Sequence, residues 1–334
     1  MSRPQRKRAT PRASVDFGWW EVFAPSLHGR AHLWNQSEWA EQIEWMASRG
    51  TRVLFLYLHW YSTGYRSSLV WLDQPDYSLN VATENAVLRR LLRQARGRKI
   101  RVYLVNQVYL YDAEVYDGPT VSDEFKDAEH YWPKRLVVAD ATQTSVRNRI
   151  SKMFVEQAEL FPNAAGLLLE AEGKTSKGNY LAKRALTERE AKLAAKVERA
   201  VRRTGYAGEV GYVYRGRELD PELFAETTKG KVRLVVFNPD PDDRTGEKGL
   251  REAVETGQLV TYAVDGFIGA RRFEARYTGR FHPEVGWKRF SEQAARHRPQ
   301  QLVFFGYDWC DIGGDPVRLR EKLATVARRV LRSA

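Results

Sequence analysis

Cysteine is nearly missing from this sequence, and so are long hydrophobic runs. Cys310 is the only cysteine among the 334 residues, so the chain can form no internal disulfide and fits a reducing compartment. The mean hydropathy is −0.55, and no apolar run approaches the length of a membrane span. No apolar segment of the secretory kind follows the first residues. We therefore expect a cytoplasmic protein with no membrane partner.

Several catalytic motifs are absent as well. No glycine-rich dinucleotide turn follows the first predicted strand, and the sequence contains no G-x-S-x-G elbow. Its six histidines form no HExxH motif, and the one close pair, His28 and His32, lies in a loop-like stretch. We therefore expect no metal and no cofactor, although a cation held by Asp and Glu side chains alone stays open.

The stretch LLLEAEGKTSKGNY contains Gly173-Lys174-Thr175 and resembles the end of a phosphate-binding loop. That loop requires a glycine five positions before its Gly-Lys pair, and Leu168 stands there instead. The residues that follow Thr175 are typical of a loop, whereas a phosphate site needs the start of a helix. The sequence therefore argues against nucleotide binding by this segment.

Positive charge dominates the chain, which has a formal net charge of +12 and a pI of about 9.7. The first twelve residues contain no acid and five bases, Arg3, Arg6, Lys7, Arg8 and Arg12. Such a run attracts polyanions without specificity. We predict a disordered basic tail over residues 1–12 and a single domain over residues 13–334.

Eight apolar or β-branched runs alternate with helical patterns along the chain. The runs span residues 15–23, 52–60, 100–110, 165–173, 209–216, 232–240, 259–267 and 302–309. This alternation predicts an α/β fold, the (β/α)8 TIM barrel, with a doubly wound open sheet as the alternative.

Three helix starts and one loop can be predicted from local patterns. We expect helices to begin at a Thr187–Glu190 capping box and at the two Asp-Pro pairs that start with Asp220 and Asp315. The long connection over residues 109–143 is predicted to be a loop above the active face.

Polar and aromatic residues recur at the ends of the predicted strands, where barrel enzymes place their sites. They are Trp20, Glu21, His59, Trp60, Asn106, Glu170, Glu172, Tyr214, Arg215, Asn238, Asp240, Asp242, Asp265, Asp308 and Trp309. Charge buried in a barrel strand is costly unless something uses it, so the repetition indicates a binding pocket. Aromatic rings stack on the C–H faces of sugars while polar groups bind the hydroxyls, which favours a carbohydrate partner.

The alternation of side chains along a strand places the two glutamates of the fourth run on one face, at different depths. Glu170 and Glu172 share one face of that strand with Leu168. If this face points inward, Glu172 lies at the barrel mouth and Glu170 lies one layer deeper. We expect the deeper carboxyl to be hydrogen-bonded and to position other groups, and the outer one to reach the substrate.

The run LVVADATQTSVRNRISKMFVEQAELFPNAAGLLLEAEG resembles the xylan α-glucuronidase family of glycoside hydrolases and related barrel glycosidases. These families share a helix after the third strand, a phrase like LFPNAAG and a strand that ends in Glu-Gly. The resemblance covers roughly residues 100–290 by the order of its motifs. It implies that Glu172, the glutamate of that pair, is the general acid.

Two further carboxylates follow from the same resemblance. The run VRLVVFNPDPDD resembles the family's sixth strand, whose terminal loop supplies an aspartate; Asp242 fits best and Asp240 is its neighbour. The third carboxylate of the family follows the seventh strand, where both Asp265 and Glu274 are candidates.

The sequence therefore predicts a glycosidase that acts on an oligo- or polysaccharide, with an acidic sugar as one possible substrate. Glu172 would protonate the leaving oxygen, and Asp242 with Asp265 or Glu274 would activate water. Acids from different sides of a barrel mouth leave room for that water, which favours inversion of configuration. One alternative is a non-catalytic barrel that binds carbohydrate or an acidic polymer. Another is a nucleic-acid-associated protein, which the acids at the mouth disfavour.

Overall fold

The computed structural model describes most of the chain, and the statements below concern these parts. They are residues 14–23, 34–72, 85–113, 115–121, 136–171, 182–215, 218–266, 283–306 and 316–333. The predicted tail over residues 1–12 lies outside them, as do four residues of the predicted site, Glu172, Glu274, Asp308 and Trp309.

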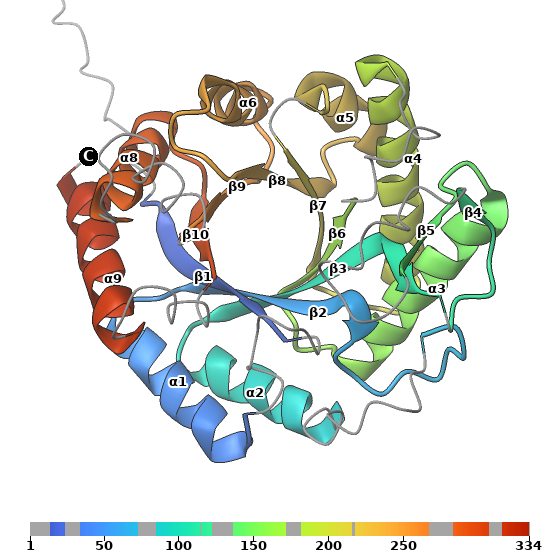
Figure 1. The fold of residues 1–334 in the computed structure, drawn as a ribbon, viewed down its shortest axis with the longest axis horizontal. Coiled ribbons are helices and arrows are strands. Elements are labelled where there is room, and N and C mark those ends of the chain that lie inside the picture. Colours follow the sequence, from blue (N-terminus) through green and yellow to red (C-terminus); the bar gives the residue numbers. More distant parts are fainter. Residues whose placement is uncertain are drawn as a thin grey trace, which may run out of the picture.

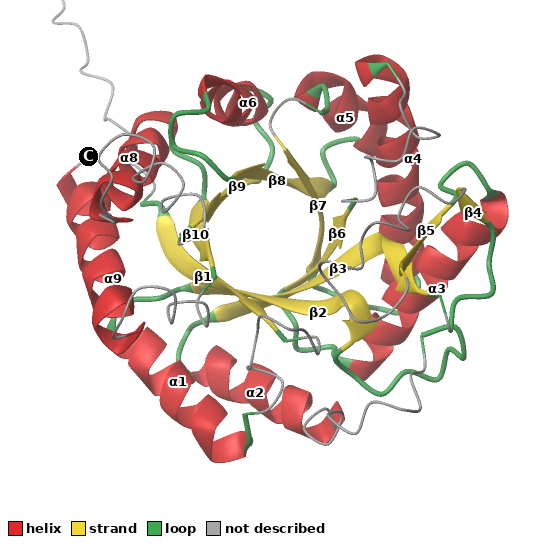
Figure 2. Cartoon of the chain, in the orientation of Figure 1, coloured by secondary structure: helices red, strands yellow, loops and turns green. Residues whose placement is uncertain are grey.

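Eight parallel strands form a closed barrel, and the described helices surround it (Figures 1 and 2). The strands are β1 (Asp16–Val22), β2 (Val53–Thr63), β3 (Arg101–Asp112), β6 (Gly166–Glu170), β7 (Glu209–Arg215), β8 (Val232–Asn238), β9 (Val260–Asp265) and β10 (Gln301–Phe305). β1 pairs with both β2 and β10, and β2 also pairs with β3, so the ring has no open edge. The predicted (β/α)8 barrel is confirmed, and the open-sheet alternative is excluded.

Each barrel strand is followed by a helix that packs on the outside of the ring (Figure 1). The helices are α1 (Gln36–Ser48), α2 (Asn85–Gly97), α3 (Thr144–Leu160), α4 (Lys183–Arg202), α5 (Pro221–Thr228), α6 (Arg244–Glu255), α8 (Pro283–His297) and α9 (Pro316–Ser333). None of these described helices is long and apolar enough to cross a bilayer.

The connection between β3 and α3 contains strands as well as loop. β3 continues to Asp112, β5 (Leu136–Ala139) pairs antiparallel with its end, and β4 (Thr120–Val121) pairs antiparallel with β5. Figure 2 shows this small antiparallel extension beside α3. The prediction of one uninterrupted loop over residues 109–143 is therefore wrong for its described parts.

Local sequence explains where some of the helices begin. Asn35 starts α1 with a reciprocal capping box to Glu38. Asp220 caps α5 through the backbone N–H groups of Glu222 and Leu223, with Pro221 in the first turn, as predicted. The predicted capping box of α4 is wrong, because that helix begins at Lys183 and Thr187 lies inside it, donating to the Lys183 carbonyl.

The interior of the barrel is a packed column of side chains. One buried cluster contains inward-facing residues of all eight strands; its members are Trp20, Val22, Val53, Phe55, Tyr57, Tyr103, Val105, Leu168, Val213, Val235, Ala263 and Val303. The alternate residues, such as Trp19 and Leu167, belong to a second cluster between the strands and the helices. The two clusters fix which face of each strand points inward.

Polar side chains close the N-terminal end of this column. Arg233 forms an ion pair with Glu209 and donates to Thr261 Oγ1 at 3.2 Å. Gln301 accepts from Thr261 at 2.6 Å and donates to the Tyr103 hydroxyl at 3.1 Å. Arg233 is only 3 % exposed, so its charge requires these partners. Among the described residues, this network leaves the C-terminal end of the column as the end open to a ligand.

Candidate active site

The registers of the strands arrange the inward-facing residues in layers of four, each layer taken from alternate strands. The deeper layer near the C-terminal end consists of Tyr57, Glu170, Phe237 and Phe305. The next layer toward the mouth consists of Val22, Gln107, Arg215 and Asp265. These two layers form the described part of the barrel mouth.

Glu170 is a buried carboxylate among aromatic rings. It lies on β6, is 9 % exposed, and accepts a hydrogen bond from the Tyr57 hydroxyl. Phe237 and Phe305 occupy the other two positions of its layer. The structure therefore shows the deeper glutamate inward-facing and hydrogen-bonded, with a tyrosine as its described partner, and its positioning role stays a prediction.

Asp265 and Arg215 bring opposite charges to the layer above. Asp265, on β9, is 7 % exposed, and Arg215, on β7, is exposed. Gln107, on β3, is fully buried and pairs in register with Glu170 of β6. A carboxylate, a guanidinium and an amide thus meet at one height of the barrel, a combination of donors and acceptors that suits sugar hydroxyls.

Gln107 was missing from the residues predicted to line the pocket. The strand-end pattern singled out its neighbour Asn106, although only one of two successive residues can face inward. The inward position of Tyr103 and Val105 determines that Gln107 does so. Their orientation depends on pairing with β2 and β6, which a local pattern does not reveal.

Trp20 and Trp60 both lie in the interior, at different heights. Trp20 is 1 % exposed and its ring contacts those of Phe55, Tyr57, Phe237 and Phe305, so it forms the floor beneath Glu170. The Trp60 ring stacks on Tyr57 with centroids 5.2 Å apart and an interplanar angle of 16°. It is only partly buried and lies nearer the mouth.

An irregularity in β2 accounts for the position of Trp60. The register of β2 against β3 shifts between Tyr57 and His59 and again after His59. Regular alternation would turn Trp60 away from the face that Tyr57 occupies, and the bulge turns it back. His59 is buried, with Nδ1 3.2 Å from Thr63 Oγ1 and its ring 5.2 Å from that of Tyr111.

Four of the strand-end residues lie on the outer side of the barrel wall. Asn106 exchanges two hydrogen bonds of 2.8 Å with Gln157 of α3. Asn238 donates to the Tyr262 hydroxyl at 2.8 Å. The other two are Tyr214, which belongs to the outer cluster, and Glu21, which alternates with the inward-facing Trp20 and Val22. The structure does not bring these four together with Glu170 and Asp265.

The loop between β8 and α6 is built from side chains that cap their own backbone. The Asn238 side chain accepts from the N–H of Asp240, Asp240 accepts from Asp242, and Asp243 accepts from Thr245 at the start of α6. Asn and Asp favour such turns because their side chains reach the backbone two residues on. The Asp242 carboxylate forms an ion pair with Arg289 of α8 and is 29 % exposed. It lies in the β8–α6 loop, on a different element from Asp265.

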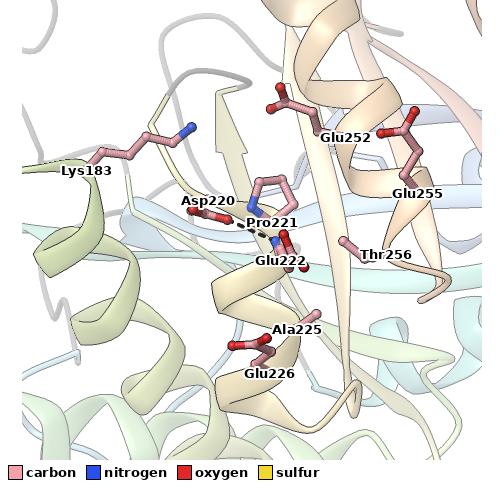
Figure 3. Close-up of a pocket in the computed structure, with 9 residues that line it drawn as sticks. All are labelled: Lys183, Asp220, Pro221, Glu222, Ala225, Glu226, Glu252, Glu255 and Thr256. Carbon is pink, nitrogen blue, oxygen red and sulfur yellow. Dashed lines mark hydrogen bonds between the residues drawn. The ribbon is translucent and has the colours of Figure 1, made fainter.

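A cavity of about 630 Å³ lies outside the barrel, between the start of α4, α5 and α6 (Figure 3). Its lining consists of Lys183, Asp220, Pro221, Glu222, Ala225, Glu226, Glu252, Glu255 and Thr256. None of these residues belongs to the barrel mouth. The carboxylates in Figure 3 come from both α5 and α6, yet no group of three or more potential metal ligands converges among the described residues.

Comparison with known proteins identifies the fold and leaves the family open. No family model and no curated protein matches the sequence. Solved structures do match. A GH138 enzyme targeting pectin rhamnogalacturonan II has a TM-score of 0.62 at 12 % identity, over 97 % of this chain and 49 % of its own. The endo-1,4-beta-mannanase from Rhizomucor miehei has a TM-score of 0.60 at 11 % identity, over 99 % of both chains.

A third structure, the chitobiase from Flavobacterium johnsoniae, has a TM-score of 0.53 at 11 % identity and matches 96 % of this chain. This chain spans about half the length of the chitobiase and of the GH138 enzyme. At such low identity these similarities establish the barrel fold and do not transfer catalytic residues.

Proposed function

We propose that this chain hydrolyses a glycosidic bond at the C-terminal end of its barrel. The observation that carries the proposal is the pair of adjacent layers in which Glu170, Gln107, Arg215 and Asp265 face the interior. Aromatic rings of Trp60, Phe237 and Phe305 lie beside them. Carboxylates beside aromatic platforms meet both demands of the reaction, which are proton transfer and stacking on a sugar ring.

Glu172 is the proposed general acid, and it follows the inward-facing Glu170 by two residues. Asp265 is the preferred base on the described geometry, because it shares the interior with Glu170 and comes from β9, with β7 and β8 between the two strands. Asp242 and Glu274 remain the other candidates. Arg215 at the mouth supports a substrate with a carboxylate, in line with the resemblance to the xylan α-glucuronidase group.

Glu172→Gln tests the proposal most directly. We expect turnover on a glycoside with a poor leaving group to fall by at least about 10², the scale of lost acid catalysis. A leaving group that needs no protonation should restore much of the rate. Asp265→Asn should abolish turnover on both substrates, because activation of water is then lost.

Glu218→Gln is the matched control, since Glu218 lies in the β7–α5 loop and its carboxylate contacts the backbone N–H of Arg215. A melting curve for each variant separates folding from chemistry. Unchanged turnover in Glu172→Gln would remove the acid assignment. If the wild-type protein bound an oligosaccharide but did not hydrolyse it, the non-catalytic barrel would be favoured.

The stereochemistry provides a second prediction. Strands β6 and β9 lie on different sides of the mouth, so acids at their ends leave space for a water beside the anomeric carbon. Inverting enzymes hold their carboxyl groups about 6.5–9.5 Å apart, and retaining enzymes about 5–5.5 Å apart. We expect inversion, observed by proton NMR of the first-formed anomer. A retained configuration would require a nucleophilic carboxylate in place of the activated water.

A further inference from the structure

The loops that lead from each helix to the next strand all lie at the N-terminal end of the barrel, opposite the proposed active site. All seven are described, and together they contain no aspartate or glutamate. Their basic residues are Arg49, Arg52, Arg98, Lys99, Arg203, Lys229, Lys231 and Arg298. We call these eight residues the basic face.

The described loops at the opposite end of the barrel have the reverse composition. In the described loops that lead from a barrel strand to a helix, Arg66 is the one basic residue. The acids in the same loops are Asp117, Asp140, Glu218, Asp220, Asp240, Asp242 and Asp243. Among the described loops, the two ends of the barrel thus carry charges of opposite sign, and such an arrangement creates a field along the barrel axis.

Most of the charge of the basic face is available to a partner. Arg52, Lys99, Arg203, Lys229 and Lys231 are exposed and form no ion pair with any described residue. Two other members are paired, Arg49 with Glu321 and Arg98 with Glu44. These two pairs are themselves partly exposed and therefore screened by solvent.

Like charges also crowd together at the edge of this face, where α9 ends. Burial lowers the pKa of Arg328, and the neighbouring charges of Arg332 and Arg49 lower it further. Repulsion among these neighbouring cations costs stability, and an anionic partner would relieve it.

Three members of the basic face adopt a backbone conformation that favours glycine. Lys99, Lys229 and Arg298 have φ of 60°, 55° and 57°, and they are the only non-glycine residues with positive φ in the described chain. Each follows the C-terminal end of a helix, where glycine is the usual residue because it has no Cβ. A cation replaces glycine at all three positions despite the conformational cost.

We propose that the basic face docks on an anionic phospholipid surface. Its cations are distributed around the ring, between β1 and β2, β2 and β3, β6 and β7, β7 and β8, and β9 and β10. A planar array of phosphate headgroups contacts all of them at once, whereas a linear polymer contacts only those along its path.

The apolar residues of these loops favour a lipid over a nucleic acid. Phe161 and Tyr206, the two aromatic residues of the loops, are 0 % and 4 % exposed, so neither can stack on a base. Leu259 is 45 % exposed beside the cations. β1 begins at this end of the barrel, and the basic residues 1–12 precede it in the sequence. This proposal departs from the expectation of no membrane partner, which rested on the lack of a spanning segment, because a peripheral contact requires none.

The test measures partition of the full-length protein onto sedimented vesicles. Vesicles of phosphatidylcholine alone are compared with vesicles in which part of the lipid is phosphatidylglycerol. We expect partition only with the anionic lipid, and we expect added salt to weaken it because exposed charges are screened. The variant Lys99→Gly/Lys229→Gly/Lys231→Gln/Arg203→Gln should lose at least about tenfold in partition coefficient. Its melting temperature should be unchanged or raised, because glycine relieves the positive φ at two of the sites.

A matched variant controls for net charge. Arg90→Gln/Lys152→Gln/Lys192→Gln/Arg244→Gln removes four exposed cations from the flanks, and these have no ion-pair partner among the described residues. It should retain most of the partition. An equal loss in both variants would reduce the effect to net charge and overturn the proposal. It would also be overturned if vesicles failed to bind while a nucleic acid did, or if the first variant lost stability and kept its partition. None of these results depends on glycosidase activity.

Discussion

Glu170 is a buried carboxylate that depends on a hydrogen-bond donor inside the barrel. Its carboxylate lies among aromatic rings and leaves water almost completely, which is unfavourable without a hydrogen-bond donor. The Tyr57 hydroxyl supplies one, and Tyr57 in turn stacks against Trp60 at the mouth. The position of the acid and that of the aromatic platform are therefore linked through one tyrosine.

Tyr57→Phe tests this link. Removal of the hydroxyl leaves the buried carboxylate short of a donor, and hydrogen bonds to charged groups contribute about 1.5–3 kcal/mol. We expect the free energy of unfolding to fall by about this amount in chemical denaturation. Tyr111→Phe is the control, because the equally buried Tyr111 hydroxyl donates to the neutral Val108 carbonyl at 2.8 Å. Its loss should be about 1 kcal/mol. Equal losses would argue that Glu170 is not charged in the folded protein.

At the scale of the secondary-structure elements, the carboxylate of Glu247 links helix α6 to α8. Glu247 Oε1 of α6 accepts from Arg296 Nη1 at 2.7 Å and lies 2.9 Å from His297 Nε2. Burial acts to raise the pKa of Glu247, but the hydrogen bond with His297 and the charge of Arg296 outweigh it. The pKa of this carboxyl therefore lies below its ordinary value of 4.5.

The lowered pKa gives a pH-dependent prediction for Glu247→Gln. Because the folded protein binds this proton less tightly than the unfolded chain, the carboxylate stabilises the fold at neutral pH. That contribution is lost as the pH falls below 4.5 and through the folded-state pKa. The difference in unfolding free energy between wild type and variant should shrink over this range. Glu292→Gln is the control, because its pair with Lys288 is largely exposed and contributes little. A difference that grows toward acid pH would contradict the assignment.

Local sequence patterns predicted the helices and strands well. They did not predict side chains whose contacts join one helix or strand to another. Asp220 before Pro221 has a local effect, so its cap could be predicted. The spacing of Glu190 from Thr187 also predicted a local cap. Glu190 is instead fully buried and accepts from the hydroxyls of Tyr109 and Tyr212 at 3.0 and 2.8 Å. Burial and the adjacent Glu190 raise the pKa of both tyrosines. These contacts join α4 to β3 and β7, which no short window of sequence contains.

For the candidate site, too, the sequence identified residues but not which of them face the interior. The composition of the strand ends identified Glu170, Arg215 and Asp265, which face the interior. It did not separate them from Asn106 and Asn238, because inward and outward residues alternate and only the pairing of neighbouring strands decides between them. The bulge in β2 that turns Trp60 inward likewise depends on pairing with β3.

At the scale of the whole molecule, the barrel depends on close contact where its first strand meets the second. β1 joins β2 to β10, and Gly18 lies between Val53 of β2 and Val303 of β10. A Cβ at Gly18 would lie 2.4 Å from the Val53 carbonyl oxygen and 2.7 Å from the Val53 Cβ. The backbone oxygen belongs to the barrel wall and cannot rotate away, so a methyl group there must separate the two strands.

Gly18→Ala should therefore lower the stability of the entire barrel. Forced overpacking and backbone shifts cost about 1–3 kcal/mol, and the effect should appear as a lower midpoint of a single cooperative transition. Gly97→Ala is the control, since a Cβ at this last residue of α2 meets no atom within 4 Å. Alanine should stabilise that site by about 0.4–1 kcal/mol by restricting the unfolded chain. Circular dichroism during denaturation measures both variants. A midpoint for Gly18→Ala at or above the wild type would mean that β1 and β2 can move apart without loss to the ring, and the close approach would then not be required for closure.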